Sequence, residues 1–425
     1  MNKRLPVALA AILTMLGPGT LYSYSLLAQP LSASFGWNSV ATTWGFAIAN
    51  LCLGFGAVAG GVWLVRSHSR RVAVTGTMLW AAGNVLAGLG TERFGLPYFY
   101  FSYGVIGGFG AGMVTIAALT AAISWFPQRR GMGGGLVAMG FGLGAVYYDQ
   151  LLQQWSAFHA VQLAATAYLG PRTPLISPPL VHDLMHIFMI SGAAFAAVGV
   201  FAASFLQRPP AEFTDANVMP CEMRLAQTAS NPQFYLLWLI LFLNCVAGIA
   251  VISNVVPIIS EMTVLSTGTV EGLYAILAVF NGLGCFFWGA ISDRAGRRGT
   301  LVLLFLVQAF SFMLIDNVHS TVAVLGMFSL ILSCYGGAFG VMPAFNADFF
   351  GLRYLAANYG LNLTAWGAAA VVGPWFASTV KEMTGTYSAI LLPLAFVLFV
   401  ALIIPIITDS PVDEHKLSGA QPTPA

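Results

Sequence analysis

The sequence predicts an all-α membrane protein with twelve transmembrane helices in two six-helix, pseudo-symmetric halves. Of its 425 residues, 58% are hydrophobic and only 8% are charged, whereas a soluble domain carries about 25% charged residues. So few charges leave too little polar surface for a soluble protein of this length. The apolar residues form repeated runs of about 20 residues, the length that crosses a bilayer as a helix. They do not show the alternation that is typical of a membrane β-barrel.

Six apolar runs come before a polar stretch and six follow it. The runs lie near 5–28, 39–65, 72–90, 97–125, 132–157 and 184–206, and then near 232–258, 270–291, 299–315, 320–345, 354–379 and 386–408. This spacing predicts a first half over 1–206, a cytoplasmic linker over 207–231, a second half over 232–408 and a cytoplasmic tail over 409–425. The first run is longer than the apolar region of a signal peptide, so we interpret it as an uncleaved span.

The basic residues predict the orientation. If both termini are cytoplasmic, all of the 17 Lys and Arg residues except Arg93, Arg172 and Lys381 fall on the inner side, as the positive-inside rule requires. None falls within a predicted span. We therefore expect a multi-pass protein of the cell membrane, a bacterial inner membrane, with both termini in the cytoplasm.

The composition also excludes classes of function. A net charge of +2 provides no basic surface for nucleic acid. A membrane-embedded enzyme would need a cluster of reactive groups within the spans, and Asp149 is the only acidic residue well inside one. No Walker-type phosphate loop occurs, so ATP is not the energy source, and no cofactor is expected.

A charged motif follows the second span of the second half. A carboxylate at the end of that span can pair with nearby arginines and with the positive N-terminus of a neighbouring helix. A glycine permits the tight turn that the motif needs. The motif, which we predict to be part of a gate, consists of Gly289, Asp293, Arg294, Gly296, Arg297 and Arg298.

This motif resembles the signature loop of the major facilitator superfamily, Gly-x-x-x-Asp-Arg-x-Gly-Arg-Arg. In the first half, the counterpart has Val65 in place of the family's Asp and His68 in place of a Gly. We therefore expect a weaker charge pair on that side. The resemblance implies the major facilitator fold, in which two halves rock about a binding site near the middle of the membrane.

Further stretches resemble one branch of that family, the oxalate:formate antiporters, which are similar to the monocarboxylate transporters. These stretches are 22–31, 125–131, 140–144, 231–238, 348–351 and 357–360. The resemblance implies exchange or cotransport of small carboxylates. It also implies a buried Arg in the eighth span and a buried Lys in the eleventh, where this chain has Cys285 and Trp366. A dicarboxylate without a cationic partner is strongly disfavoured in a membrane, so oxalate itself is not expected.

Aromatic, hydroxyl and amide side chains remain as candidates for contact with a solute. A single buried Tyr or Trp more often packs in a core with its polar tip bonded. Several of them on spans 1, 4, 8, 10 and 11 favour a common cavity, and two of them lie four residues apart on one helix face. The candidates are Tyr22, Tyr24, Asn50, Thr115, Asn254, Asn281, Cys285, Tyr335, Phe339, Asn362 and Trp366.

Asp149 is a candidate for proton coupling. It follows Arg130 by about 19 residues, which is roughly 28 Å along a helix, so it lies nearer the outer face. A buried carboxylate there could carry a proton. The alternative is a carboxylate at an outer vestibule or at the membrane interface.

Other features predict no metal site and no disulfide. His182 and His186 have the spacing of two metal ligands, but no third ligand is evident, so we interpret them as a solvated helix start. The five cysteines show no paired spacing. The insertion over 156–183 is either a short outer lid or an interfacial segment.

The sequence therefore predicts a secondary active transporter of a small organic anion. A monocarboxylate is expected, moved with protons or by exchange, through rocker-switch alternating access. The alternative is an exporter of neutral or apolar small molecules. The expected partners are a small-molecule solute and the lipid bilayer, and we expect a monomer.

Overall fold

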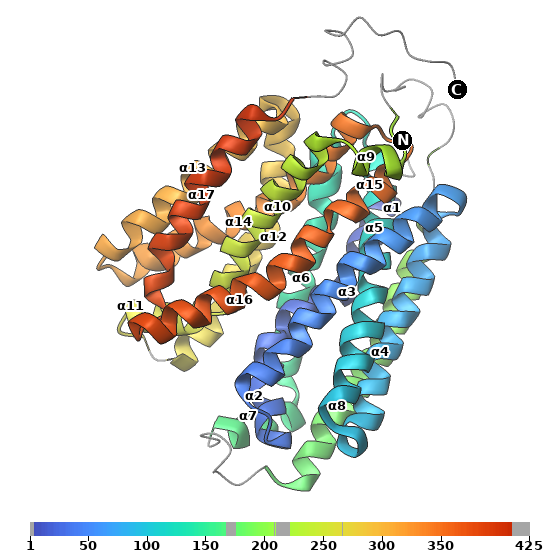
Figure 1. The fold of residues 1–425 in the computed structure, drawn as a ribbon. Coiled ribbons are helices and arrows are strands. Elements are labelled where there is room, and N and C mark those ends of the chain that lie inside the picture. The colour runs from blue at the N-terminus through green and yellow to red at the C-terminus, as the bar shows by residue number, and fades with distance from the viewer. Residues whose placement is uncertain (1–3, 167–175, 208, 210–221, 266, 410–425) are drawn as a thin grey trace, which may run out of the picture.

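The computed structural model describes residues 4–166, 176–207, 209, 222–265 and 267–409, and no β-strand occurs within these ranges. Its long helices form two groups, α1 to α8 and α10 to α17, which lie side by side (Figure 1). Asn38 and Asn231 help to start two of these helices, because their side chains accept hydrogen bonds from the backbone N–H groups of Ala41 and Gln233.

The first half contains the first six crossings and one short additional helix. Its elements are α1 (Arg4–Gly19), η1 (Thr20–Ser23), α2 (Tyr24–Phe35), α3 (Ser39–Arg66), α4 (Ser69–Phe99), η2 (Tyr100–Gly107), α5 (Gly108–Trp125), α6 (Arg130–Gln154), α7 (Ser156–Thr166) and α8 (Pro178–Ala203). The first crossing consists of α1, η1 and α2 and ends at Phe35, beyond the predicted limit. The predicted insertion contains α7, and residues 167–175 lie outside the described part.

The second half contains the other six crossings, two of them built from consecutive helices. Its elements are α9 (Leu225–Ala229), α10 (Pro232–Ile252), α11 (Val255–Met262), α12 (Thr267–Ala295), α13 (Arg297–Leu314), η5 (Ile315–Asn317), α14 (Thr321–Phe350), α15 (Leu355–Asn362), α16 (Thr364–Thr384), η6 (Ser388–Ile390) and α17 (Leu391–Ile407). The short helix α9 lies in the predicted linker, most of which is outside the described residues.

The prediction of twelve membrane-spanning helices is confirmed. Ten helical segments of the described chain are long and apolar enough to cross a membrane. One of them, Ser69–Trp125, reverses at Gly95, whose φ of 70° suits a residue without a side chain, and so contains two crossings. The remaining crossing is α6, whose many glycines lower its hydropathy.

Close backbone contacts join the two halves along two seams. Helix α6 packs against α12 and α14, while α3 packs against α15 and α16. A Cβ atom added at Gly131 of α6 would lie 2.2 Å from the carbonyl oxygen of Gly289, and one at Gly61 of α3 would lie 2.2 Å from that of Ala356. Small residues therefore let the backbones touch, as in other packed membrane helices.

The two ends of the bundle differ. We call the end where α1 begins and α17 ends the basic end, and the opposite end the far end (Figure 1). The seams described above reach the basic end. Towards the far end, the helices of the two halves spread apart, and a cavity there is lined by α2, α10, α11 and α12. The protein is therefore closed at the basic end.

Candidate functional site

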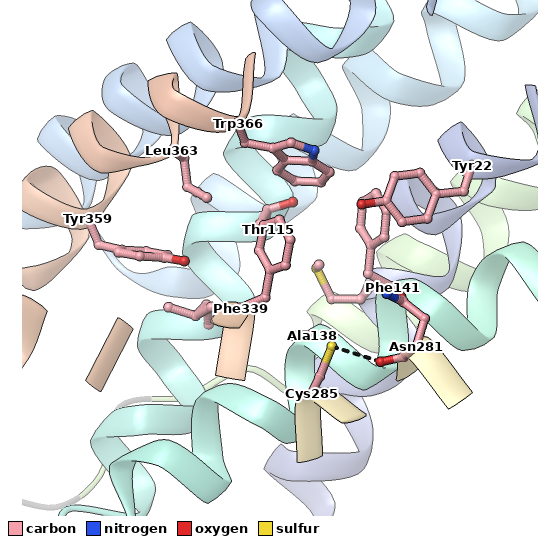
Figure 2. A pocket seen from close by; sticks show the side chains of 12 residues that line it. Tyr22, Thr115, Ala138, Phe141, Asn281, Cys285, Phe339, Tyr359, Leu363 and Trp366 are labelled. Atoms are coloured by element: carbon pink, nitrogen blue, oxygen red, sulfur yellow. Dashed lines mark hydrogen bonds between the residues drawn. The ribbon is translucent and has the colours of Figure 1, made fainter. Parts of the chain in front are cut away.

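A central cavity lies between the two halves (Figure 2). Its walls come from α1, η1, α5 and α6 on one side and from α12, α14, α15 and α16 on the other. No charged side chain is among the described residues that line it. The lining residues are Met15, Tyr22, Thr115, Leu119, Ala138, Phe141, Asn281, Cys285, Phe339, Tyr359, Leu363 and Trp366.

Six of the candidates predicted from the sequence line this cavity: Tyr22, Thr115, Asn281, Cys285, Phe339 and Trp366. Tyr335 lies directly behind it, because its hydroxyl is 2.7 Å from that of Tyr22. This hydrogen bond joins η1 of the first half to α14 of the second. The rings of Tyr335 and Phe339 are in edge-to-face contact, with centroids 5.6 Å apart, which places them on one helix face.

The other candidates lie away from the cavity. The Tyr24 hydroxyl donates to the carbonyl of Thr42 at 2.6 Å, inside the first half. The amide of Asn50 donates to the carbonyl of Phe46, one turn earlier in α3, and that of Asn254, which lies between α10 and α11, donates to the carbonyl of Ala250. Asn362 is fully buried, and neither amide atom of its side chain has a hydrogen-bond partner.

Sequence reasoning missed six lining residues: Met15, Leu119, Ala138, Phe141, Tyr359 and Leu363. Phe141 lies in the glycine-rich stretch of α6, and Tyr359 lies in the stretch 357–360, so both were within recognised motifs. The four aliphatic residues carry no signal that separates them from residues that face lipid.

Aromatic rings give the cavity rigid walls. The Trp366 ring is in edge-to-face contact with Tyr22, Phe141 and Phe339, with centroid distances of 6.1, 5.2 and 5.1 Å. Such pairs contribute about 0.5–1.5 kcal/mol beyond the burial of their area. The cavity is therefore a preformed, largely apolar space.

Its polar groups include two donors without an acceptor. The Nε1–H of Trp366 is buried and has no hydrogen-bond partner. The hydroxyl of Tyr359 points towards the interior (Figure 2) and makes no recorded hydrogen bond within the described chain. The amide of Asn281 donates to the carbonyl of Leu332 at 3.1 Å, and the hydroxyl of Thr115 donates to Ala111 at 2.8 Å. The described lining of the cavity thus offers neutral N–H and O–H donors and no fixed cation.

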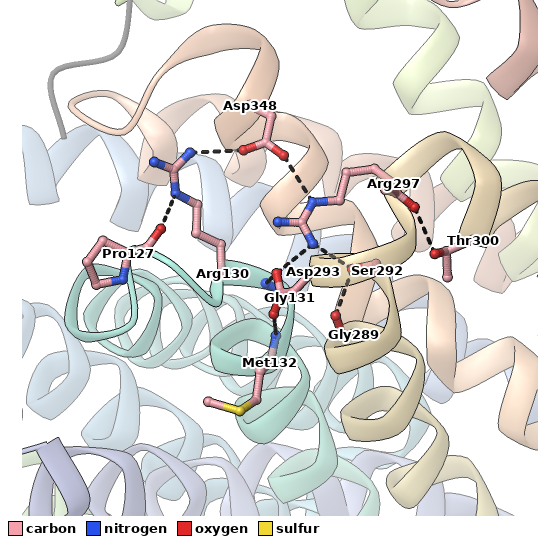
Figure 3. Close-up of polar contacts among 11 residues, drawn as sticks. Pro127, Arg130, Gly131, Met132, Gly289, Ser292, Asp293, Arg297, Thr300 and Asp348 are labelled. Atoms are coloured by element: carbon pink, nitrogen blue, oxygen red, sulfur yellow. Dashed lines mark hydrogen bonds and ion pairs between the residues drawn. The ribbon is translucent and has the colours of Figure 1, made fainter.

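A second polar cluster lies at the basic end (Figure 3). Asp293 of α12 accepts hydrogen bonds from the backbone N–H groups of Gly131 and Met132, both at 2.8 Å, and from Arg297 at 2.7 Å. Gly131 and Met132 belong to the first turn of α6, where the helix dipole favours a negative charge. The carboxylate therefore joins the two halves.

Asp348 of α14 extends this cluster. It accepts from Arg130 at 2.9 Å and from Arg297 at 3.0 Å, so α6, α13 and α14 are held together. Arg298 instead forms an exposed ion pair with Asp409 at 3.2 Å. The motif alone did not indicate the part played by Asp348 and Arg130. We call Arg130, Asp293, Arg297 and Asp348 the basic-end network.

The corresponding loop of the first half has no such network. Val65 is exposed, and Arg66, Arg70 and Arg71 form no ion pair recorded within the described residues. The neighbouring turn before α15 is contacted by Glu222, whose carboxylate accepts from the backbone N–H groups of Leu352 and Arg353 at 3.3 and 2.8 Å.

The two histidines and Asp149 are not among the residues that line the central cavity. His182 lies 3.3 Å from Glu92, and its ring is 4.1 Å from that of His186, but no group of three metal-ligating residues occurs within the described residues. Cys52, Cys245, Cys285 and Cys334 are free thiols, and Cys221 lies outside the described part. Asp149 is buried in α6 beyond the central cavity.

Two pseudo-symmetric bundles, a cavity between them and a closed end define a transmembrane transporter rather than an enzyme. The chain belongs to the Major Facilitator Superfamily, whose family model matches residues 7–374 and 237–425.

Similar proteins agree with this assignment. The chain is 26% identical over 397 residues to the oxalate:formate antiporter of Oxalobacter formigenes, covering 92% of this chain and 88% of that protein. It is 22% identical over 415 residues to human monocarboxylate transporter 14, covering 81% and 78%. A crystal structure of the E. coli fucose:proton symporter FucP superposes with a TM-score of 0.69 at 15% identity, covering 95% and 98%. That structural likeness concerns the fold alone.

Proposed function

We propose that this transporter moves a small organic anion, a monocarboxylate, across the membrane by alternating access. The observation that carries the proposal is the chemistry of the central cavity, which is apolar, contains unpaired neutral donors and has no cation among its described lining residues. The indole N–H of Trp366 and the hydroxyl of Tyr359 are each suited to donate to a carboxylate oxygen.

The absence of charged lining residues limits the charge of the solute. Each negative charge that enters such a cavity loses its hydration, and neutral donors replace only part of it. One carboxylate can be held in this way, but a second one would have no partner. A proton bound elsewhere, or exchange for another monoanion, would keep the transport cycle electrically neutral.

The relatives support a small carboxylate as the substrate class. One relative is named as an oxalate:formate antiporter and another as a monocarboxylate transporter. Cys285 and Trp366 stand where the resemblance implies the cations of oxalate carriers, so we favour formate-like or lactate-like monoanions over oxalate.

The contacts at the two ends support a rocking motion. The basic-end network and the glycine seams would have to separate for the cavity to open at the basic end, while the far end would close. By the positive-inside rule the basic end faces the cytoplasm. We infer a multi-pass protein of the bacterial inner membrane with both termini inside, acting as a monomer.

Counterflow in proteoliposomes tests the proposal. Vesicles loaded with unlabelled lactate, pyruvate or formate receive the labelled acid outside, with and without a pH gradient, and protein-free vesicles serve as the control. We expect saturable exchange of at least one of the three acids.

The aromatic, uncharged walls would also suit a neutral apolar solute, which is the competing function. If none of the three acids exchanges while a labelled apolar compound is moved by the protein, the monocarboxylate proposal is wrong.

A further inference from the structure

Asp149 lies on the surface where the two halves meet. Helix α6 presents small residues to α12: Gly131 faces Gly289, Gly135 faces Cys285 and Gly142 faces Gly282. Residues seven apart lie two turns along the same helix face. Asp149 follows Gly142 by seven residues, so it continues this seam towards the far end.

The Asp149 side chain is enclosed but has no hydrogen-bond partner. Only 1% of its surface is exposed, and neither carboxylate oxygen makes a hydrogen bond. The Ser23 hydroxyl lies beside it but donates to the carbonyl of Ala145, at 3.3 Å. The cost of burying a polar group is therefore not offset within the protein.

The groups that face Asp149 carry no charge. From α12 across the seam, Tyr274 lies close enough to interact with it electrostatically, and Tyr148 is its neighbour on α6. The Tyr148 hydroxyl is bonded to that of Ser191 on α8 at 2.8 Å. No Lys, Arg, His or second acid interacts with Asp149 in the part of the chain that the structure describes.

Tyr274 lies between Asp149 and the far-end cavity. It lines the far-end cavity together with Ser25 and Ser253, both of which are exposed. Asp149 does not itself line the central cavity: it follows Phe141, the last cavity-lining residue of α6, by eight residues, about 12 Å along the helix. A proton can therefore reach Asp149 through this route without entering the central cavity.

The two charge states of Asp149 have different costs. An ionised carboxylate in a seam without a cation, next to a Ser23 hydroxyl that donates to Ala145 instead, relies on the water of the far-end cavity. Closing the far end brings α2 towards α11 and α12 and removes that water. The neutral acid needs no such hydration, so closure is easier once a proton is bound.

We propose that Asp149 is a proton-binding site that controls closure of the far end. Water in the far-end cavity supplies one proton to a carboxylate oxygen, the far end closes over the neutral acid, and the proton returns to that water when the end reopens. No covalent bond other than O–H changes. The site would regulate the transport cycle of the proposed function, but proton binding itself requires no solute.

Labelling of a cysteine at the far end tests this proposal without a solute. Ser253→Cys is placed in the full-length protein in liposomes, and its reaction with a membrane-impermeant maleimide is measured from pH 5 to pH 8. Each rate is divided by that of the same chain unfolded in detergent, which removes the intrinsic pH dependence of the thiol. The chain without Ser253→Cys corrects for native cysteines.

We expect the corrected rate to fall by up to about tenfold per pH unit on acidification, as a single proton-linked equilibrium requires. Asp149→Asn should label slowly at every pH, because the amide imitates the neutral acid. Asp149→Glu should keep the pH dependence of labelling, because it retains a carboxylate. Asp316→Asn, a change at an exposed far-end carboxylate, should behave as the unchanged protein does.

The proposal is overturned if Asp149→Asn keeps the full pH dependence, or if Ser253→Cys labels equally at all pH values with Asp149 present. Neither result depends on which solute is carried. Failure of carboxylate exchange would remove the proposed function and leave these labelling results intact, so the two proposals fail separately.

Discussion

Trp366 combines two functions within one side chain. Its ring packs against Tyr22, Phe141 and Phe339 and so forms the wall of the central cavity. Its Nε1–H has no acceptor in the protein. A buried donor that is left unpaired costs about 1–3 kcal/mol, and a carboxylate that accepts from it would recover that energy on binding.

Replacing the indole separates these two functions. Trp366→Phe keeps an aromatic wall but removes the donor. We expect the half-saturation concentration for monocarboxylate exchange to rise about tenfold, because a hydrogen bond to a charged group contributes about 1.5–3 kcal/mol. Counterflow over a range of solute concentrations measures this change.

Tyr24→Phe is the matched control, since the Tyr24 hydroxyl is bonded to Thr42 inside the first half. It should leave the half-saturation concentration unchanged. Equal effects of the two substitutions would show that Trp366 acts only through packing.

Part of the cavity could be predicted from residue type and span alone. Tyr22 and Tyr24 were equal candidates, yet two residues along a helix correspond to about 200°, so they point in nearly opposite directions. Only Tyr22 faces the second half. The direction that a helix presents to its neighbours depends on packing, which one sequence without an alignment does not reveal.

At the scale of elements, the seams and the basic-end network join the two halves at the basic end, and we propose that they keep it closed. Span positions were predictable because a membrane requires long apolar helices. A reversal between residues 90 and 97 was predicted as well, and it lies at Gly95. The helix α7 within the insertion was not predicted, because it depends on local turns. Asp348 was missed as a partner because it lies 51 positions from the nearer arginine, Arg297, and only the fold brings the two together.

The seam between α3 and α15 has no room for a methyl group at Gly61. A Cβ atom there would lie 2.2 Å from the carbonyl oxygen of Ala356. We expect Gly61→Ala to push the halves apart at a cost of about 1–3 kcal/mol and to open the basic end. The reaction of native Cys285, which lines the cavity, with a maleimide applied from the basic side should become faster.

Gly326→Ala is the control for this measurement, because nothing lies within 4 Å of a Cβ atom at that position of α14. The labelled peptide identifies the thiol that has reacted. If Gly61→Ala leaves the Cys285 rate at the control value, the seam does not limit opening.

Removing Asp348 from the basic-end network should have a similar effect. Asp348→Asn deprives Arg130 and Arg297 of their shared carboxylate, and both guanidiniums are largely buried. Removing a carboxylate partner from buried charges is costly, so the closed end loses stability even though Arg297 keeps Asp293, and Cys285 labelling from the basic side should rise severalfold.

Asp409→Asn serves as the comparison, since the ion pair between Asp409 and Arg298 is exposed and such pairs contribute about 0–1 kcal/mol. Asp409→Asn should change the rate of Cys285 labelling from the basic side only slightly. A larger effect of Asp409→Asn than of Asp348→Asn would contradict the assigned role of the network.

At the scale of the whole molecule, the charges and the cavity serve different purposes. Ion pairs lie at the ends of the bundle, where the halves meet and separate, while the described lining of the central cavity is uncharged. The family and the twelve crossings follow from the sequence. The proposed preference for one negative charge depends on which side chains the two halves bring together.

The central claim is that the cavity accepts one carboxylate and rejects two. Proteoliposomes loaded with lactate are given labelled lactate or labelled oxalate at equal concentration. The account predicts lactate exchange with oxalate entry at least about a hundredfold slower, because an unpaired buried charge costs several kcal/mol. Oxalate exchange at a rate comparable to that of lactate, or oxalate exchange without lactate exchange, would contradict it.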